Sequence, residues 1–135
     1  MSDNIAFALV SPDRSLFDEK VKEVTIPAEK GELQALPLHT PLIAKLGVGE
    51  LSCTLVSGTR KRVAVSGGFV EVLPDKVTVL VRTAELPEEI DEKRAEDALK
   101  RAEQMLLHPD DKTDIQRARM AFTRASVRLR VARHL

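Results

Sequence analysis

The sequence predicts an α+β protein, in which an N-terminal antiparallel β-sandwich or barrel precedes a C-terminal antiparallel two-helix hairpin. Residues 5–86 consist of short runs rich in Val, Ile and Thr, separated by turn residues, and they hold all six glycines. Such punctuated, strand-length runs are typical of sandwiches and barrels. After Pro87 the apolar residues recur at helical spacing instead. We therefore predict a sandwich domain over residues 1–86 and a hairpin domain over residues 87–135.

Composition limits the classes of function. The chain has 135 residues, 43% of them hydrophobic, which allows one domain or two small ones with a core. Its formal net charge is zero, whereas a general nucleic-acid binder needs a basic excess. No apolar run approaches the roughly 20 residues that span a bilayer, and no secretory leader is visible. We expect a cytoplasmic chain that meets the membrane only through partners.

The first region predicts strands joined by tight turns. In "SGTR", Gly58 can adopt the positive φ that a turn requires, and in "LPDK", Pro74 and Asp75 suit a type I turn. Cys53, the single cysteine, lies in the alternating run "LSCTLV". One thiol cannot form an internal disulfide, which fits a reducing compartment. We expect Cys53 to be a packing residue and not a nucleophile.

The second region predicts two helices. Acidic residues follow Pro87 in the first helical turn, where they complement the helix dipole; they are Glu88, Glu89, Asp91 and Glu92. The first stripe is Ala95, Ala98, Ala102 and Met105, with Leu99 and Leu106 alongside. Pro109 breaks the pattern, and Thr113 or Asp114 can cap the second helix. The second stripe is Ile115, Ala118, Phe122, Ala125, Leu129 and Ala132. Because the facing residues are small, we expect a modest interface that can open.

The two helices differ in charge. Residues 88–103 carry seven acids and four bases, whereas residues 114–135 carry one acid, Asp114, and six arginines. The arginines are Arg117, Arg119, Arg124, Arg128, Arg130 and Arg133. The second helix can therefore pair with the first or bind an acidic partner.

Several segments, in this order, resemble the epsilon subunit of bacterial F-type, proton-translocating ATP synthase. They are "VSPDRSLFDEKVKEVTIPAEKGELQALP", "LPLHTPLIAKLGVGEL", "SGGFVEVLPDKVTVLVRTAE" and "DIQRARMAFTRASVRLRV". The resemblance covers essentially all 135 residues. It implies a sandwich of about ten strands followed by the helical hairpin.

The resemblance also implies a function. In the family, the non-catalytic epsilon subunit belongs to the central stalk and helps couple proton flow to rotary ATP synthesis. Its sandwich binds the gamma subunit and rests on the c-ring, so the expected location is peripheral, on the cytoplasmic face of the bacterial cell membrane. Its hairpin moves between a folded state and an extended state that touches the beta subunits and inhibits ATP hydrolysis.

Some family members bind ATP on the folded hairpin through Ile or Leu, Asp, two variable residues, Arg and Ala. Residues 90–95 match this motif. By position, the resemblance implies an ATP site made of Glu85, Ile90, Asp91, Arg94, Ala95, Arg101, Arg124 and Arg128. ATP would be a regulatory ligand, and no cofactor is required.

The residue chemistry fits this site. Spacings of four and seven place Ile90, Arg94 and Arg101 on one face of the first helix, and Arg124 lies one turn from Arg128. Arginines form strong charge-assisted bonds to phosphates, while Asp91 could accept from an adenine amino group and Ile90 could pack on the ring. No P-loop is present, and the histidines lack partners at metal-ligand spacing. Binding without hydrolysis is therefore expected.

Two alternatives remain open. The charged face can be merely solvated, with pairs such as Glu96–Lys100 and Asp97–Arg101 along the first helix. The chain would then be a helical-hairpin interaction module with no nucleotide site. An enzyme is the other alternative, but no catalytic arrangement of residues is visible.

Overall fold

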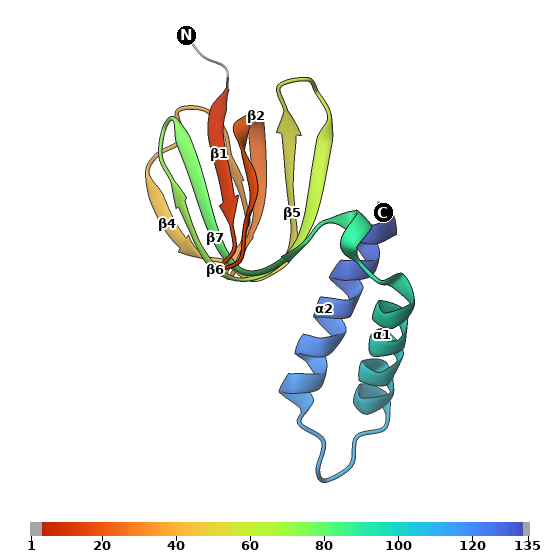
Figure 1. The fold of residues 1–135 in the computed structure, drawn as a ribbon. Coiled ribbons are helices and arrows are strands. Elements are labelled where there is room, and N and C mark those ends of the chain that lie inside the picture. Colours follow the sequence, from red (N-terminus) through yellow and green to blue (C-terminus); the bar gives the residue numbers. More distant parts are fainter. Residues whose placement is uncertain (1–3, 134–135) are drawn as a thin grey trace. The chain divides into compact units, whose positions relative to one another are not determined.

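The computed structural model describes residues 4–133, and contacts divide the chain into two compact units between Ala84 and Glu85. The first unit contains the strands and the second the helices (Figure 1). The strands are β1 (Ile5–Val10), β2 (Ser15–Ala28), β3 (Gly31–Ala35), β4 (Leu42–Lys45), β5 (Val48–Leu55), β6 (Arg60–Val72) and β7 (Lys76–Glu85). A 3₁₀ turn, η1 (Pro87–Glu89), precedes α1 (Glu92–Leu107) and α2 (Ile115–Arg133). The predicted fold class is confirmed.

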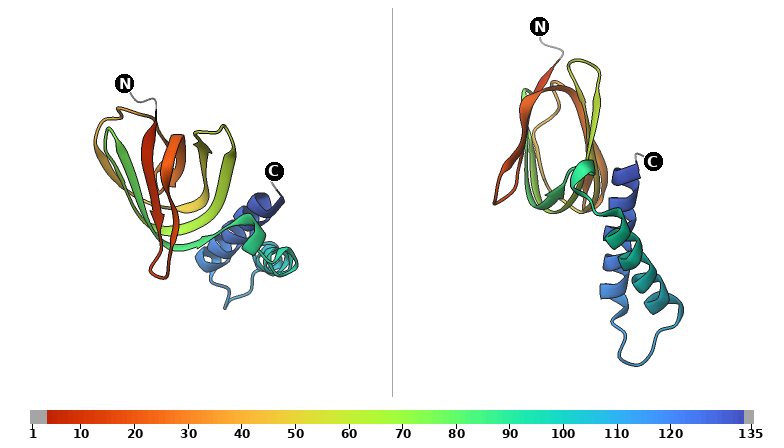
Figure 2. Two further views of the ribbon diagram at one scale, coloured as in Figure 1. Left: turned by 45° about the horizontal axis from the view of Figure 1, so that its top comes forward. Right: turned by 45° about the vertical axis from the view of Figure 1, so that its right-hand side comes forward.

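The strands of the first unit form one continuous set of pairings. The order is β1-β7-β6-β5-β2-β3, and β1 also pairs with β2, so five strands close on themselves. β4 lies outside this order and pairs with β6. The β1–β7 pairing is parallel, and the other pairings with a known register are antiparallel. Figure 2 shows the long strands arching around a common interior. Closure leaves few exposed strand edges, which limits pairing with other chains.

The described residues form seven strands, fewer than the ten or so expected, because neighbouring runs join into long strands. In β6, the runs before and after Gly67 and Gly68 form one strand of 13 residues. Both glycines have positive φ, and a Cβ on Gly68 would lie 1.9 Å from the carbonyl oxygen of Leu80. Glycine is therefore required at position 68, where the backbone of β6 passes close to that of Leu80 in β7.

The interior of the first unit consists of large aliphatic and aromatic side chains. Burial alternates along β1, so Ile5, Phe7 and Leu9 are inside, and the ring of Phe7 stacks 5.9 Å from that of Phe17. Cys53 is also buried, and burial is the main reason that the pKa of its thiol rises to about 11. The thiol is thus protonated at neutral pH, and its predicted role as a packing residue is confirmed.

Both predicted hairpin turns are present. Gly58 has a φ of 96° between β5 and β6. Between β6 and β7, the amide of Leu73 donates to the carbonyl of Lys76 at 2.7 Å, which closes the turn at Pro74 and Asp75. Each turn therefore joins two long strands that are neighbours in the sheet.

The start of α1 differs from the prediction. Residues 87–89 form a 3₁₀ turn, Ile90 is extended, and α1 begins only at Glu92. Asp91 is the N-cap, since its carboxylate accepts from the amide of Arg94 at 3.1 Å. Asp is favoured at this non-helical position, because its short side chain can reach an unpaired amide of the first turn.

The hairpin interface has the small residues expected. Ala95 and Ala102 of α1 and Ala118 and Ala125 of α2 are buried. Asp114 caps α2 by accepting from the amide of Arg117 at 3.0 Å, as predicted. The predicted apolar stripes were less accurate toward the helix ends. Met105, in the predicted stripe of α1, is 50% exposed, whereas Val127 and Val131, outside the predicted stripe of α2, are buried. Among the helices of residues 4–133, none is long and apolar enough to cross a membrane.

Candidate functional site

A small cavity lies within the helical unit, where the segment entering α1 meets the last turns of α2. Its volume is about 200 Å³. Six of the eight residues predicted for a nucleotide site line it: Glu85, Ile90, Asp91, Arg94, Ala95 and Arg128. Residues distant in sequence therefore meet because α1 and α2 run antiparallel.

The other two predicted residues, Arg101 and Arg124, do not line the cavity. Arg101 lies seven residues beyond Arg94, or about 10 Å along the helix, and Arg124 lies one turn before Arg128. In residues 4–133 neither arginine forms an ion pair. The predicted common face of Ile90, Arg94 and Arg101 on helix one was wrong, because Ile90 precedes α1.

Glu89 lines the cavity although the sequence analysis did not include it. Its carboxylate accepts from the amide of Leu86 at 2.8 Å and so stabilises the 3₁₀ turn. The sequence feature that could have indicated this role is a glutamate at the third position of a turn that starts with proline, as in a capping box. This turn fixes the backbone just before Ile90 and Asp91.

Arg128 is already engaged by a carboxylate. Its Nε lies 2.5 Å from Oε1 of Glu85, and both side chains are about one-third to two-fifths exposed. A guanidinium has five N–H donors, so this contact leaves others for a ligand. The pair also joins the segment before α1 to α2.

The charges of the lining decide which part of a ligand could enter. Three carboxylates line the cavity, on Glu85, Glu89 and Asp91, against two guanidiniums, on Arg94 and Arg128. Such a lining favours a neutral group with hydrogen-bond donors over a phosphate chain. The volume is also below the 300 Å³ or so of small-molecule sites that enclose their ligands. A nucleotide could therefore place only its base here, with its phosphates outside.

Asp91 can serve two functions at once. One carboxylate oxygen, Oδ1, accepts from the amide of Arg94 as the N-cap. A carboxylate has about four acceptor positions on two oxygens, so the other oxygen can accept from a ligand. The cap holds the carboxylate at the mouth of the helix, where the helix dipole also stabilises its charge.

The ion pairs predicted along α1 are not the ones that form. Asp97 pairs with Lys93 at 3.3 Å and not with Arg101, while Glu96 pairs with Arg133 of α2 and not with Lys100. For Glu96 the reason is that the antiparallel partner helix brings the guanidinium of Arg133 within reach of its carboxylate. Consequently Asp97 does not neutralise Arg101.

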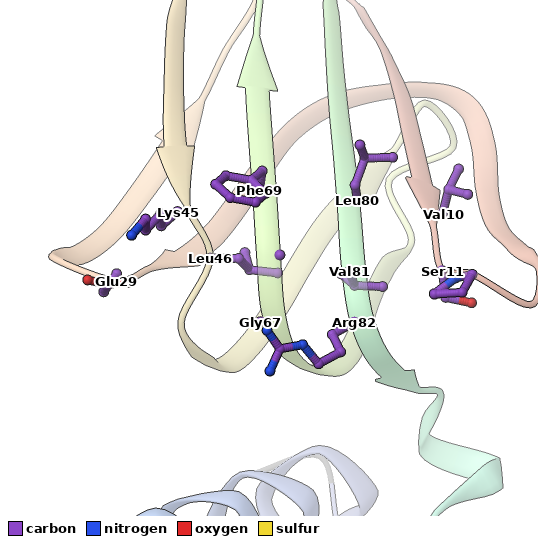
Figure 3. Close-up of a pocket in the computed structure, with 12 residues that line it drawn as sticks. Val10, Ser11, Glu29, Lys45, Leu46, Gly67, Phe69, Leu80, Val81 and Arg82 are labelled. Atoms are coloured by element: carbon purple, nitrogen blue, oxygen red, sulfur yellow. The ribbon is translucent and has the colours of Figure 1, made fainter.

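A second hollow lies on the sandwich. A groove of about 680 Å³ opens among β1, β6 and β7 and the segment around Lys45. Figure 3 shows Lys45 and Glu29 at one side, Leu80 and Val10 at the other, and Phe69 between them. Phe69 is 53% exposed and Leu80 54%. Large apolar side chains exposed around a groove are typical of a protein-interaction surface.

A second exposed apolar group lies at β4 and the loop before it. Leu38 is 73% exposed and Ile43 is 71% exposed. Leu38 has a φ of 66°, the left-handed conformation that a bulky residue rarely adopts, while its amide donates to the carbonyl of Pro74 at 2.7 Å. A strained backbone that presents an apolar side chain to solvent is often found at functional surfaces.

Comparison with known proteins gives the identity of both units. Residues 4–87 match the family model of the ATP synthase Delta/Epsilon chain β-sandwich domain, and residues 88–133 match its long α-helix domain. The chain belongs to the Delta/Epsilon chain family of ATP synthase. The predicted resemblance is thereby confirmed, and with it the expectation of a non-catalytic subunit of the central stalk.

Individual relatives agree along nearly the full length. The chain is 42% identical over 132 residues to the ATP synthase epsilon chain of Syntrophobacter fumaroxidans, covering 98% of each protein. It is 45% identical over 124 residues to that of Bacillus velezensis, covering 92% of this chain and 93% of the relative. A chain in the cryo-EM structure of Euglena gracilis mitochondrial ATP synthase (OSCP, F1 and c-ring) superposes with a TM-score of 0.83 at 27% identity, over 99% of this chain and 84% of that one.

Within residues 4–133, no cluster of three or more His, Cys, Asp or Glu side chains could hold a metal ion. The candidate functional features described above are the hairpin cavity and the exposed apolar surface of the sandwich.

Proposed function

We propose that this epsilon-type subunit helps couple proton flow to rotary ATP synthesis and restrains ATP hydrolysis through its hairpin, whose folded form binds ATP. The observation that carries the nucleotide site is the meeting of six predicted residues around one cavity. In this proposal, the adenine enters the cavity and packs on Ile90, and its amino group donates a hydrogen bond to the carboxylate of Asp91. The phosphates extend along the hairpin toward Arg124 and Arg101.

The proposed partners are the gamma subunit and c-ring for the sandwich and the beta subunits for the extended hairpin. Membership in the family and the structural likeness to a chain from an F1 and c-ring complex support this assembly. The exposed Leu38, Ile43, Phe69 and Leu80 offer an apolar surface for docking. The subunit would then lie peripherally on the cytoplasmic face of the bacterial cell membrane, held there by the complex.

Calorimetric titration of the full chain with ATP, ADP and GTP tests the nucleotide site. We expect ATP to bind more tightly than GTP, because guanine presents an oxygen acceptor where adenine presents an amino donor to Asp91. Asp91→Asn should keep the helix cap, since Asn caps as well as Asp, but reduce the preference for ATP. Asp91→Ala should lose both the cap and the ligand contact.

Two arginines on α2 provide a matched pair. Arg124→Ala should weaken ATP binding roughly tenfold, the usual order for losing one charge-assisted bond. Arg130→Ala removes the same charge six residues later from an exposed position that is not part of the cavity, and it should leave affinity nearly unchanged. Absence of ATP binding at millimolar concentration, or equal effects of the two variants, would remove the nucleotide site. The hairpin would then be an interaction module without one.

The stalk role has its own test. Immobilised chain should retain a gamma subunit, and replacing Phe69 and Leu80 by Ser should weaken that retention while the fold, monitored by circular dichroism, stays intact. Failure of the unmodified chain to retain gamma would contradict the proposed role whatever the outcome with ATP.

A further inference from the structure

The end of α2 is attached to the start of α1 by one guanidinium. Nε of Arg133 lies 3.5 Å from Oε1 of Glu92, and its Nη2 donates to Oε1 of Glu96. Glu92 and Glu96 are four residues apart, so they lie on the same face of α1, one turn from each other. In residues 4–133, these are the ion pairs that join α1 to α2.

The other contacts near the end of α2 are the pair of Arg128 with Glu85, which precedes α1, and apolar burial. The alanines Ala95, Ala102, Ala118 and Ala125 are buried along the hairpin and remove little apolar surface from water. Toward the end of α2 the buried residues are larger, namely Val127, Leu129 and Val131, but apolar contact is non-directional and does not fix the orientation of the last turn. An isolated ion pair on a surface contributes little, and all three of these side chains are more than one-third exposed. Here, however, one guanidinium serves two carboxylates, so a single side chain is ordered for two contacts. The charges also suit the helix dipoles, since Arg133 lies in the last turn of α2 and Glu92 in the first turn of α1.

We propose that Arg133, Glu92 and Glu96 form an electrostatic clamp that holds the last turn of α2 on the first turn of α1 and so positions Arg128 at the cavity. Arg128 precedes Arg133 by five residues, about 7.5 Å along the same helix. Release of the last turn then leaves the pair with Glu85 as the ion pair that holds Arg128, so that Arg128 is held less firmly beside Asp91 and Arg94 at the start of α1. The clamp makes closure of the hairpin sensitive to ionic strength even without a ligand. Its effect on the cavity rests on the proposed nucleotide function.

Amide hydrogen exchange of the full chain without nucleotide tests the clamp directly. In the Glu92→Gln, Glu96→Gln double variant, amides in the last two turns of α2 should exchange about three- to tenfold faster at low salt. In 1 M salt the difference should largely vanish, because the screening length falls to about 3 Å. Asp97→Asn is the matched control, since it breaks the Lys93 pair within α1 and should leave α2 unchanged. Equal effects of the double variant and the control would overturn the clamp.

A mutant cycle separates the clamp from effects on each helix alone. Removing the two carboxylates weakens the dipole stabilisation of α1, and Arg133→Gln does the same for α2. The triple variant combines Arg133→Gln with the two glutamate substitutions. If the three residues form a clamp, its amides at the end of α2 should exchange no faster than those of the more strongly affected parent variant, because both parents lose the same interaction. If the increase in exchange rate of the triple variant equals the product of the increases in its two parents, the residues act independently and the clamp is wrong. Arg133→Lys should retain part of the protection, because an ammonium can pair with one carboxylate but lacks the guanidinium fork.

The positioning of Arg128 is tested by ATP titration of the same variants. The double variant should bind ATP about three- to tenfold more weakly, although neither Glu92 nor Glu96 lines the cavity. If the unmodified chain binds no ATP, the proposed nucleotide function fails, while the exchange experiment still decides whether the clamp exists. If it binds ATP and the double variant binds equally well, the positioning role is overturned.

Discussion

The sandwich and the hairpin are stabilised by different kinds of side chain. The sandwich encloses Phe7, Leu9, Ile26 and Leu51, all with 0–1% exposure. Each such side chain contributes about 1.5–3 kcal/mol when fully buried. At the hairpin interface, residues such as Ala95 and Ala125 contribute about 0.8 kcal/mol for a methyl-sized group. The sandwich therefore gains more from each buried side chain than the hairpin does from its alanines, and under the proposed function it would remain folded while charges and ligands set the state of the hairpin.

The largest expected effect concerns the sandwich core. Phe7→Ala should lower the free energy of unfolding of the sandwich by about 3–5 kcal/mol, because it removes a buried ring and leaves a cavity. Phe69→Ala deletes the same group from a half-exposed position and should cost less than about 1 kcal/mol. Urea unfolding followed by circular dichroism measures both. Similar losses for the two variants would contradict the distinction between core and docking surface.

A smaller effect is expected from overpacking the hairpin. Ala102→Leu should destabilise the closed hairpin by about 1–3 kcal/mol, since a larger side chain does not fit between closely packed helices. Gln104→Leu adds a similar side chain at an exposed position of α1 and serves as the control. Regional hydrogen exchange should show faster exchange in α1 and α2 only, with the sandwich unchanged. Loss of protection in the sandwich as well would mean that the two units do not open separately.

The smallest effect is a dependence of sandwich stability on pH. The carboxylate of Glu23 accepts from Gln34 and Thr54 and pairs with Arg60 at 3.3 Å. These contacts, the Gln34 hydrogen bond foremost, lower the pKa of Glu23 below 4.5. Because the folded state binds this proton less readily than the unfolded state, the stabilisation is present above pH 4.5 and is lost as pH falls through the lowered pKa.

Glu23→Gln should remove that part of the pH dependence. Below pH 4.5, the variant should lose less stability on acidification than the unmodified chain, as measured by urea unfolding at several pH values. Glu32→Gln, at an exposed position of the neighbouring β3, is the control for a general change in net charge. Parallel pH profiles for Glu23→Gln and the unmodified chain would show that the contacts of Glu23 do not stabilise the fold.

The sequence predicted features that depend on local pattern. Helical spacing identified both helices, and Gly58 and Pro74 located two turns, because these signals arise from backbone preferences of single residues. The parallel pairing of β1 with β7 was not predicted, since it joins segments some 70 residues apart. The start of α1 was also misplaced, because acidic residues suit a 3₁₀ turn, a cap and a first helical turn alike.

The candidate site shows the same limit. The motif at residues 90–95 identified most of the cavity lining, whereas the position of Arg101 outside the cavity depends on distance along the helix. The ion partners of Glu96 and Asp97 could not be inferred either, since pairing within a helix competes with pairing across the hairpin. The three-dimensional arrangement of the helices therefore decides which of several possible partners each charged side chain pairs with.

Hydrogen exchange of the full chain with and without ATP tests the central claim most directly, namely that the hairpin is the part that a ligand closes. With saturating ATP, amides of α1 and α2 should exchange at least tenfold more slowly, by mass action on the closed state, while amides of the sandwich strands should not change. Unchanged exchange in the helices, or equal slowing in both units, would contradict the account.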